Sequence, residues 1–229
     1  PVDGYQLNLF ACKLDRSQQL AERSLLVTQI PEKSLLPKPS YWLEAIAALN
    51  YAIPFLNQWQ EYVMVANADS QIYLEGLNYF FLTKTVNLSP GEKFASLEHS
   101  FKCIQEAVKT QASFTRYCSL ARVAAELGKR QISVEILEKL ITNINSGRLI
   151  RVNEPFLPVS QQYDDQIFNN NLQDWFLVSI VETCENRRVF SSYFSAKQSV
   201  SSLNQIIHKP FHSHKSEVRL LLANKRLDG

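Results

Sequence analysis

Three histidines near the C-terminus have a spacing that could hold a metal ion. His208, His212 and His214 form an H-x-x-x-H-x-H pattern, and two histidines four residues apart lie on one face of a helix, where they can share a cation. Pro210 lies between the first two and prevents a regular helix there. We therefore expect a solvated loop at the start of a helix, and no metal site. His99 lies in an amphipathic helical pattern and is expected to be structural.

Paired carboxylates are a second place to look for chemistry. Asp164 and Asp165 are adjacent in a predicted loop, where such pairs cap or solvate the backbone more often than they act as acid and base. Glu182 and Glu185 share a helix face, but no Glu-x-x-His motif accompanies them, so they do not indicate a di-iron site. No set of residues predicts a catalytic centre.

The segment of residues 148–170 interrupts the helical pattern with Pro155 and Pro158. Long ordered loops in compact domains often carry function. The candidate residues in this loop and beside it are Arg151, Glu154, Tyr163, Asp164 and Trp175. The alternative interpretation is a structural insertion that fills the helical stack between two helix pairs and buries Phe156 and Trp175.

Polar residues at helical spacing suggest a binding groove. They lie on two predicted helices, as Gln71, Glu75 and Asn78 on the first and Thr115, Ser119, Arg122 and Glu126 on the second. Residues three and four apart lie on one helix face, and side chains of these types can form hydrogen bonds with an extended peptide. A solvated helix face explains the same pattern equally well.

Composition excludes several classes of function. The chain has six glycines in 229 residues, where an average soluble chain of this length carries about sixteen. No two lie close enough for a G-x-G-x-x-G turn, a phosphate loop or a G-x-S-x-G elbow, so we expect no cofactor. The balance of 24 Lys and Arg against 22 Asp and Glu indicates neither nucleic acid nor an anionic membrane as a partner.

The cysteines and the apolar pattern favour the cytoplasm. The four cysteines show no C-x-x-C pattern and are expected to be buried free thiols. No apolar run reaches the roughly twenty residues needed to span a bilayer, and no basic-then-apolar leader opens the chain. Because the sequence begins at Pro1 rather than Met, we expect a piece of a longer protein.

Apolar residues recur at intervals of three and four residues from Ser40 onward, which predicts an all-α fold. The expected helices cover residues 15–28, 40–53, 55–66, 70–83, 90–108, 114–128, 132–144, 172–186, 198–208 and 217–225. Pro54 is expected to break the second of these helices, and Ser89 to Glu92 form a helix start. We expect residues 1–39 to be an N-terminal segment and connector, and residues 40–229 to be the helical domain.

Several apolar residues are expected to face the core. They include Trp42, Ile46, Leu49, Ile53, Tyr73, Leu77, Phe80, Phe81, Phe94, Leu97, Phe101, Ile104, Val108, Ile132, Ile136, Leu140 and Ile144.

One helix pair resembles a tetratricopeptide (TPR) hairpin. The resemblance rests on the spacing of Tyr117, Leu120, Ala121, Ala124, Gly128, Ser133, Leu137 and Leu140. It departs from that pattern because Ser133 stands where Ala is usual, and because no Pro closes the unit. Similar pairs span about 70–109 and 172–208, which predicts an α-α superhelix with right-handed stacking. The alternative is an irregular helical bundle without repeat geometry.

The order of several short segments resembles a known family. The segments are SYWLEAI (40–46), SLARVA (119–124), LG (127–128), EPFLP (154–158), WF (175–176) and FSS (190–192). Together they look like the helical region appended to bacterial, often cyanobacterial, FkbM-type methyltransferases and some glycosyltransferases. That resemblance implies an accessory domain, with the catalytic fold elsewhere in the polypeptide.

These observations leave three hypotheses for function. The first is a non-catalytic interaction domain that binds a protein or a neighbouring catalytic domain. The second is a part of a methyltransferase or glycosyltransferase whose loop residues, such as Glu154 and Asp164, reach into an active site. The third is self-assembly through the many aromatic residues.

Overall fold

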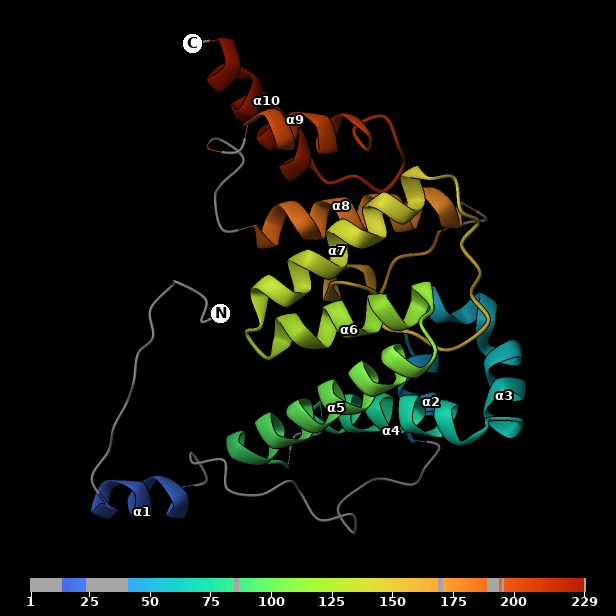
Figure 1. Ribbon diagram of the computed structural model, residues 1–229, viewed down its shortest axis with the longest axis vertical. Helices are drawn as coiled ribbons and strands as arrows, with labels where there is room; N and C mark the ends of the chain where they lie inside the picture. The colour runs from blue at the N-terminus through green and yellow to red at the C-terminus, as the bar shows by residue number, and fades with distance from the viewer. Residues whose placement is uncertain are drawn as a thin grey trace.

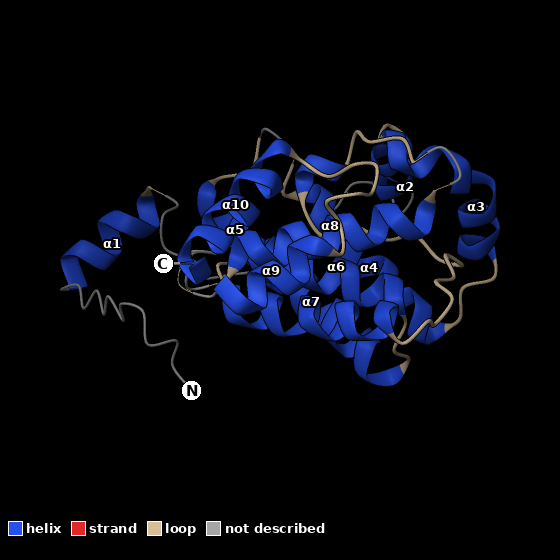
Figure 2. Ribbon diagram, turned by 90° about the horizontal axis from the view of Figure 1, so that it is seen from above, coloured by secondary structure: helices blue, strands red, loops and turns tan. Residues whose placement is uncertain are grey.

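The computed structural model describes residues 14–23, 41–84, 87–168, 171–188, 194 and 196–228. These residues form helices and loops, and no strand occurs among them (Figure 2). The fold is therefore all-α, as the apolar periodicity predicts. The end of the expected N-terminal connector, Ser40 at the start of the expected second helix and the FSS segment lie outside the described residues.

The N-terminal elements are short. They are α1 (Leu14–Glu22), α2 (Tyr41–Ala47), the 3-10 helix η2 (Asn50–Phe55) and α3 (Leu56–Met64). Pro54 lies inside η2, and the chain resumes α-helical geometry only after it, because proline lacks the N–H that a continuous helix needs. This break turns Ile53 outward, where it is 56% exposed, so the prediction that it faces the core was wrong.

The next two helices, α4 (Ala68–Leu82) and α5 (Pro90–Thr110), pack along one another. Ser89 caps α5, and a capping box with Glu92 satisfies backbone N–H groups at both positions. Tyr73, Leu77 and Phe80 are buried, as predicted. Phe94 is 46% exposed, against prediction, whereas the neighbouring Ala95 and Leu97 are buried, so Phe94 lies on the outer side of α5.

The pair α6 (Phe114–Glu126) and α7 (Arg130–Asn145) is the predicted hairpin. Gly128 joins the two helices with a φ of +76°, a conformation that is strained for residues with a Cβ. Ala121 and Ala124 are fully buried between the helices. Ile132 is 36% exposed in the first turn of α7, so its predicted place in the core was wrong.

The C-terminal part contains α8 (Leu172–Arg187), α9 (Ala196–Asn204) and α10 (His214–Asp228). The last helix begins three residues before the predicted start and ends three residues after the predicted end. The predicted pairing of α8 with the following helix is only weakly present, because α9 packs chiefly against α10.

The helices from α4 to α8 form a stack in chain order, with each packing on its predecessor (Figure 1). Each helix buries its apolar face only where it packs against the next helix, so each helix depends on its neighbours in the stack for stability. One large apolar core runs through it from α2 to α8, and a small second core joins α8 to α9 and to residues just beyond it. No described helix combines the length and apolar character needed to cross a bilayer.

Candidate functional site

The middle of the loop that follows α7 lies inside the stack. We name residues 148–168 the inner loop; apart from the short 3-10 helix η3 (Gln161–Tyr163), it has no regular structure. Every residue from Glu154 to Val159 is buried. A buried segment without helical or strand pairing must find other partners for its backbone polar groups.

Side chains of the helices provide those partners. Carbonyl oxygens of the inner loop accept hydrogen bonds from Tyr51 (at Phe156), Tyr73 (at Pro155), Arg122 (at Pro158), Arg187 (at Val159) and Asn50 (at Asp165). Pro155 and Pro158 carry no N–H, which lowers the number of donors that the buried segment must satisfy. The Leu157 N–H donates to Ser119 Oγ at 2.9 Å. The inner loop is therefore held as an extended peptide, largely by side chains.

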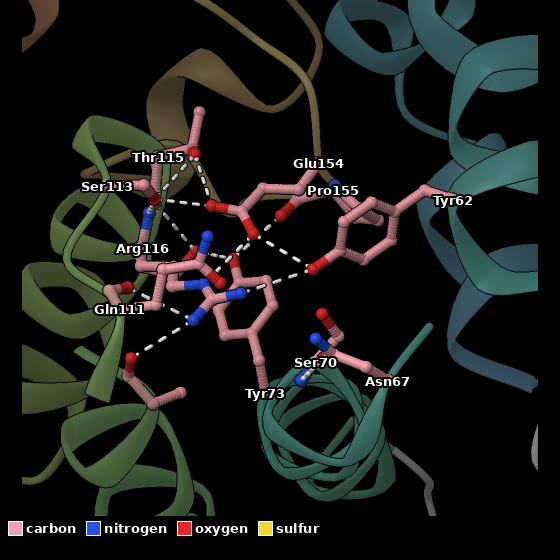
Figure 3. Close-up of polar contacts among 12 residues, drawn as sticks. Tyr62, Asn67, Ser70, Tyr73, Gln111, Ser113, Thr115, Arg116, Glu154 and Pro155 are labelled. Atoms are coloured by element: carbon pink, nitrogen blue, oxygen red, sulfur yellow. Dashed lines mark hydrogen bonds and ion pairs between the residues drawn. The ribbon is translucent and has the colours of Figure 1, made fainter. Parts of the chain in front are cut away.

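Glu154 anchors the first end of this segment (Figure 3). Its Oε1 accepts hydrogen bonds from Ser113 and, at 3.0 Å, from Thr115, and its Oε2 accepts from Tyr62 at 3.0 Å. Arg116 Nε lies 2.9 Å from the same Oε2. The carboxylate side chain is 8% exposed and that of Arg116 is 1% exposed, so this is a buried ion pair with both carboxylate oxygens occupied.

Four of the five N–H donors of the Arg116 guanidinium are in hydrogen bonds, one of them to Glu154. Its Nη1 donates to the carbonyls of Ala107 and Gln111 at 3.0 and 3.1 Å, and its Nη2 donates to Tyr62 at 3.2 Å. Burial lowers the pKa of Arg116, but Glu154 and Tyr62 raise it by more, so the pKa lies above its ordinary value. This permanently charged group therefore links the end of α5, the start of α6 and the inner loop.

Tyr73 and Ser119 hold the middle of the buried segment. The Tyr73 hydroxyl lies 2.8 Å from Ser119 Oγ and donates to the Pro155 carbonyl at 2.7 Å. Burial raises the pKa of Tyr73 well above its ordinary value, with Glu154 adding to the effect. The hydroxyl therefore keeps its proton and acts as a structural donor.

Arg122 anchors the second end. It makes a bidentate contact with Asp164, with both N–O distances 3.1 Å, and its Nε donates to Glu126 at 2.6 Å. Burial raises the pKa of Glu126, but Arg122 and Lys84 lower it by more, so the pKa of this carboxyl lies below its ordinary value. Paired Arg–carboxylate contacts of this kind fix orientation as well as charge.

Phe156 lies at the centre of an aromatic cluster. Its ring centroid is 5.2 Å from that of Tyr51, 5.4 Å from Phe176 and 5.8 Å from Trp59. Phe156 and Trp175 are both completely buried. The two ion pairs thus flank a buried aromatic side chain in the middle of the segment.

Ser133 and Arg187 bring α7 and α8 to the same segment. Ser133 Oγ donates to the Ala121 carbonyl at 2.8 Å and accepts from Arg187 at 2.8 Å, while Arg187 also donates to Val159. Burial lowers the pKa of Arg187 to about 10. The serine that departs from the TPR pattern is therefore required as a polar bridge.

Glu182 joins the inner loop to the C-terminal helices. It accepts hydrogen bonds from the Tyr163 hydroxyl at 2.6 Å, the Ser213 N–H at 2.6 Å and the Ser216 hydroxyl at 2.7 Å. Ser213 immediately precedes α10, so this buried carboxylate lies at the positive end of that helix. This carboxylate therefore links η3 to the start of α10.

The structure brings the two predicted site groups together. The α6 residues Thr115, Ser119 and Arg122 contact the inner loop itself, with Glu126 held by Arg122, so this face of α6 is not an open groove. The three predicted residues on α4 differ from one another in exposure: Gln71 is exposed, Glu75 is half-buried and Asn78 is buried. Arg151 is exposed and contributes nothing to the buried segment.

The histidine pattern forms no cluster of three ligands. His212 and His214 each contact Glu217, at 3.0 and 2.7 Å, and His208 is exposed. Pro210 lies in the turn between α9 and α10, where no regular helix forms, as its type predicts, and Phe211 follows with a φ of +79°.

Sequence reasoning missed several of the residues that hold the inner loop. They are Tyr51, Tyr62, Tyr73 as a donor, Arg116, Glu182 as an anchor and Arg187. The one available signal was Arg116, a charged residue within a helix otherwise dominated by small and apolar residues. Its partner lies 38 residues away, so local spacing could not identify it.

No family model matches the chain, and no curated protein or solved structure matches it. What the protein does is therefore inferred from the contacts described above.

Proposed function

We propose that the chain is a non-catalytic, TPR-like interaction domain, accessory to a bacterial transferase, in which the inner loop fills the peptide-binding face. The domain then works as a rigid scaffold. It positions a partner protein or a neighbouring catalytic domain through surfaces other than the face occupied by the inner loop.

The proposal rests on one observation: the inner loop, an extended segment of the same chain, occupies the face of α6 that would otherwise bind a peptide. Arg116 and Arg122 each pair with an inner-loop carboxylate, and Ser119 accepts the Leu157 N–H between them. The contacts combine backbone recognition with a central aromatic anchor, as helical-repeat domains do with peptide ligands.

The TPR-like geometry has support from the α6–α7 pair. Ala121 and Ala124 are fully buried where the helices meet, and Gly128 adopts the left-handed conformation at the turn. The successive packing of α4 to α8 is what a superhelical stack requires. We propose the right-handed superhelix on this basis.

The cytoplasm is the compartment that we propose. The described cysteines Cys103, Cys118 and Cys184 are free, and burial raises the pKa of the Cys184 thiol to about 11. Protonated free thiols fit a reducing environment. The competing proposal is self-assembly, in which the partner is a second copy of this chain.

The transferase-fragment hypothesis has less support. It requires Glu154 and Asp164 to reach into an active site, yet Arg116 and Arg122 occupy both carboxylates inside the stack. Exposing Glu154 would leave the buried Arg116 without its counter-charge, and exposing Asp164 would leave Arg122 with Glu126 as its one carboxylate partner among the described residues.

Ligand titration and complex formation test the proposal. We expect calorimetry with S-adenosylmethionine and with UDP-glucose to show no binding to the chain. We also expect the catalytic domain encoded in the same reading frame, expressed separately, to form a one-to-one complex with it in light scattering. Saturable binding of either small molecule would contradict the non-catalytic assignment, and failure to form the complex would contradict the accessory role.

A further inference from the structure

Away from the inner loop, three potential metal ligands of different types meet between α4 and α5. Their donor atoms, from Glu75, His99 and Cys103, all lie within 4.8 Å of one another. His99 Nε2 is 3.1 Å from Glu75 Oε1 and 3.5 Å from Cys103 Sγ. His99 and Cys103 are four residues apart on α5, so both project from one face of that helix.

A close approach of the two helices creates this cluster. A Cβ placed on Gly76 would lie 2.6 Å from Ile104 Cγ1 and 3.2 Å from the Cys103 Cβ, so only glycine fits. Ser100 Oγ donates to the Gly76 carbonyl at 2.7 Å and fixes the contact. Figure 1 shows α4 and α5 side by side along this contact. The glycine thus brings its neighbour Glu75 to the two ligands on α5.

The ring of His99 is held in place from α4. Tyr79, one turn after Glu75, packs edge-on against it with a centroid separation of 4.2 Å. Tyr79 is 2% exposed, so its own position is fixed by burial. A ligand whose ring is already oriented loses less freedom when it binds a cation.

The same geometry argues against a thiol nucleophile. In a nucleophile–base–orienter arrangement the imidazole uses one nitrogen for the thiol and the other for the carboxylate. Here both contacts fall on Nε2. Burial, with a contribution from Glu75, raises the pKa of the Cys103 thiol to about 11, whereas an activated cysteine has a lowered pKa.

We propose that Glu75, His99 and Cys103 form a three-ligand site for Zn²⁺. Tetrahedral zinc with ordinary bond lengths separates N and O ligands by about 3.3 Å and N and S ligands by about 3.5 Å. The observed separations of 3.1 and 3.5 Å match these edges. A carboxylate and a thiolate together balance the charge of the ion, which favours binding in a half-buried position.

The proposed ligands are partly exposed, so solvent can reach the site. The side chain of Glu75 is 42% exposed and that of His99 is 24% exposed. Water or a ligand from outside can therefore complete a tetrahedron, as in zinc sites with three protein ligands. Binding requires the Cys103 thiol to lose its proton, so loading releases a proton to the buffer.

Cobalt substitution tests the proposal on the full chain. Co²⁺ added to the metal-free protein is expected to give thiolate-to-metal charge transfer and the strong visible bands of tetrahedral coordination. Zn²⁺ is expected to displace it, with calorimetry showing one site and proton release. Cys103→Ser is expected to abolish the charge-transfer band, and His99→Gln and Glu75→Gln are each expected to weaken Zn²⁺ binding by at least about tenfold.

Matched controls identify the site. Cys12→Ser removes a thiol elsewhere in the sequence, and Glu98→Gln removes the carboxylate next to His99; both are expected to bind as the parent protein does. Circular dichroism checks that each variant folds. If a ligand variant does not fold, the cobalt spectrum of the parent protein decides. A parent spectrum without a thiolate band, or Zn²⁺ affinity unchanged in Cys103→Ser, would overturn the proposal.

Discussion

Arg116 and Glu154 form a buried ion pair across 38 residues of sequence, with Nε and Oε2 2.9 Å apart. The arginine comes from the first turn of α6 and the glutamate from the inner loop, and both side chains are buried. This face of α6 is therefore occupied by the chain's own segment.

The first prediction concerns this pair. Glu154→Gln keeps the shape of the side chain but leaves the Arg116 charge buried without its counter-charge, so we expect the free energy of unfolding to fall by about 3 kcal/mol. Urea unfolding measures the change. The matched control is Glu106→Gln, at an exposed pair with Lys109, which is expected to cost less than about 0.5 kcal/mol. Equal losses in the two variants would show that the buried pair has no special role.

The second prediction concerns the aromatic anchor. Phe156→Ala removes a completely buried ring surrounded by other aromatic side chains, so the expected loss of stability is about 3–5 kcal/mol. Phe94→Ala, at a ring that is 46% exposed, is the control and is expected to cost less than about 1 kcal/mol. Thermal or urea unfolding compares them. A small loss at Phe156 would mean that the inner loop rests loosely on the stack.

The third prediction separates packing from hydrogen bonding at Ser133. Alanine is the residue usual at this position in TPR hairpins, so packing alone predicts no loss on Ser133→Ala. The structure predicts a loss of about 1–2 kcal/mol, because Arg187 would lose an acceptor at 2.8 Å in a buried site. Urea unfolding of Ser133→Ala beside the parent protein measures the difference. An unchanged or increased stability would remove Ser133 from the polar network.

The fourth prediction is a pH dependence at the start of α10. A bond to the Lys209 carbonyl, followed by the contact with Glu217, raises the pKa of His212 above its ordinary value. Protonation therefore stabilises the folded state; the contribution is complete below the ordinary pKa of about 6.5 and is lost as the pH rises through the folded pKa.

Variants at two histidines test this dependence. We expect His212→Gln to lower the free energy of unfolding by about 0.5 kcal/mol at about pH 5.5, and to have no effect at about pH 8. His208→Gln is the control, because His208 is exposed. A loss in His212→Gln that is the same at both pH values would contradict the assignment.

Local patterns in the sequence predicted the helices well. The capping box at Ser89 and Glu92, the break at Pro54 and the turn at Gly128 each depend on residues close together in the chain. The predictions of burial were wrong where the exposure of a side chain depends on whether another element packs against it. Ile53 and Phe94 have apolar side chains at helical spacing, but no element covers them.

The sequence pattern identified two groups of candidate residues, but not the contact between them. The polar stripe of Thr115, Ser119 and Arg122 and the loop carboxylates Glu154 and Asp164 were both identified from type and spacing. Each group has an ordinary explanation by itself, as a solvated helix face and as a capped loop. Only tertiary structure brings them together, because pairing over about forty residues leaves no periodic signal.

Native-state hydrogen exchange at the Leu157 amide tests most directly whether the inner loop is a fixed part of the stack. This N–H donates to Ser119 Oγ at 2.9 Å inside the core, so we predict that it exchanges only on global unfolding, as slowly as the amide of Ala121 in α6. Exchange at Leu157 as fast as at the exposed Arg151 would contradict the account, because the face of α6 would then open to solvent and to other peptides.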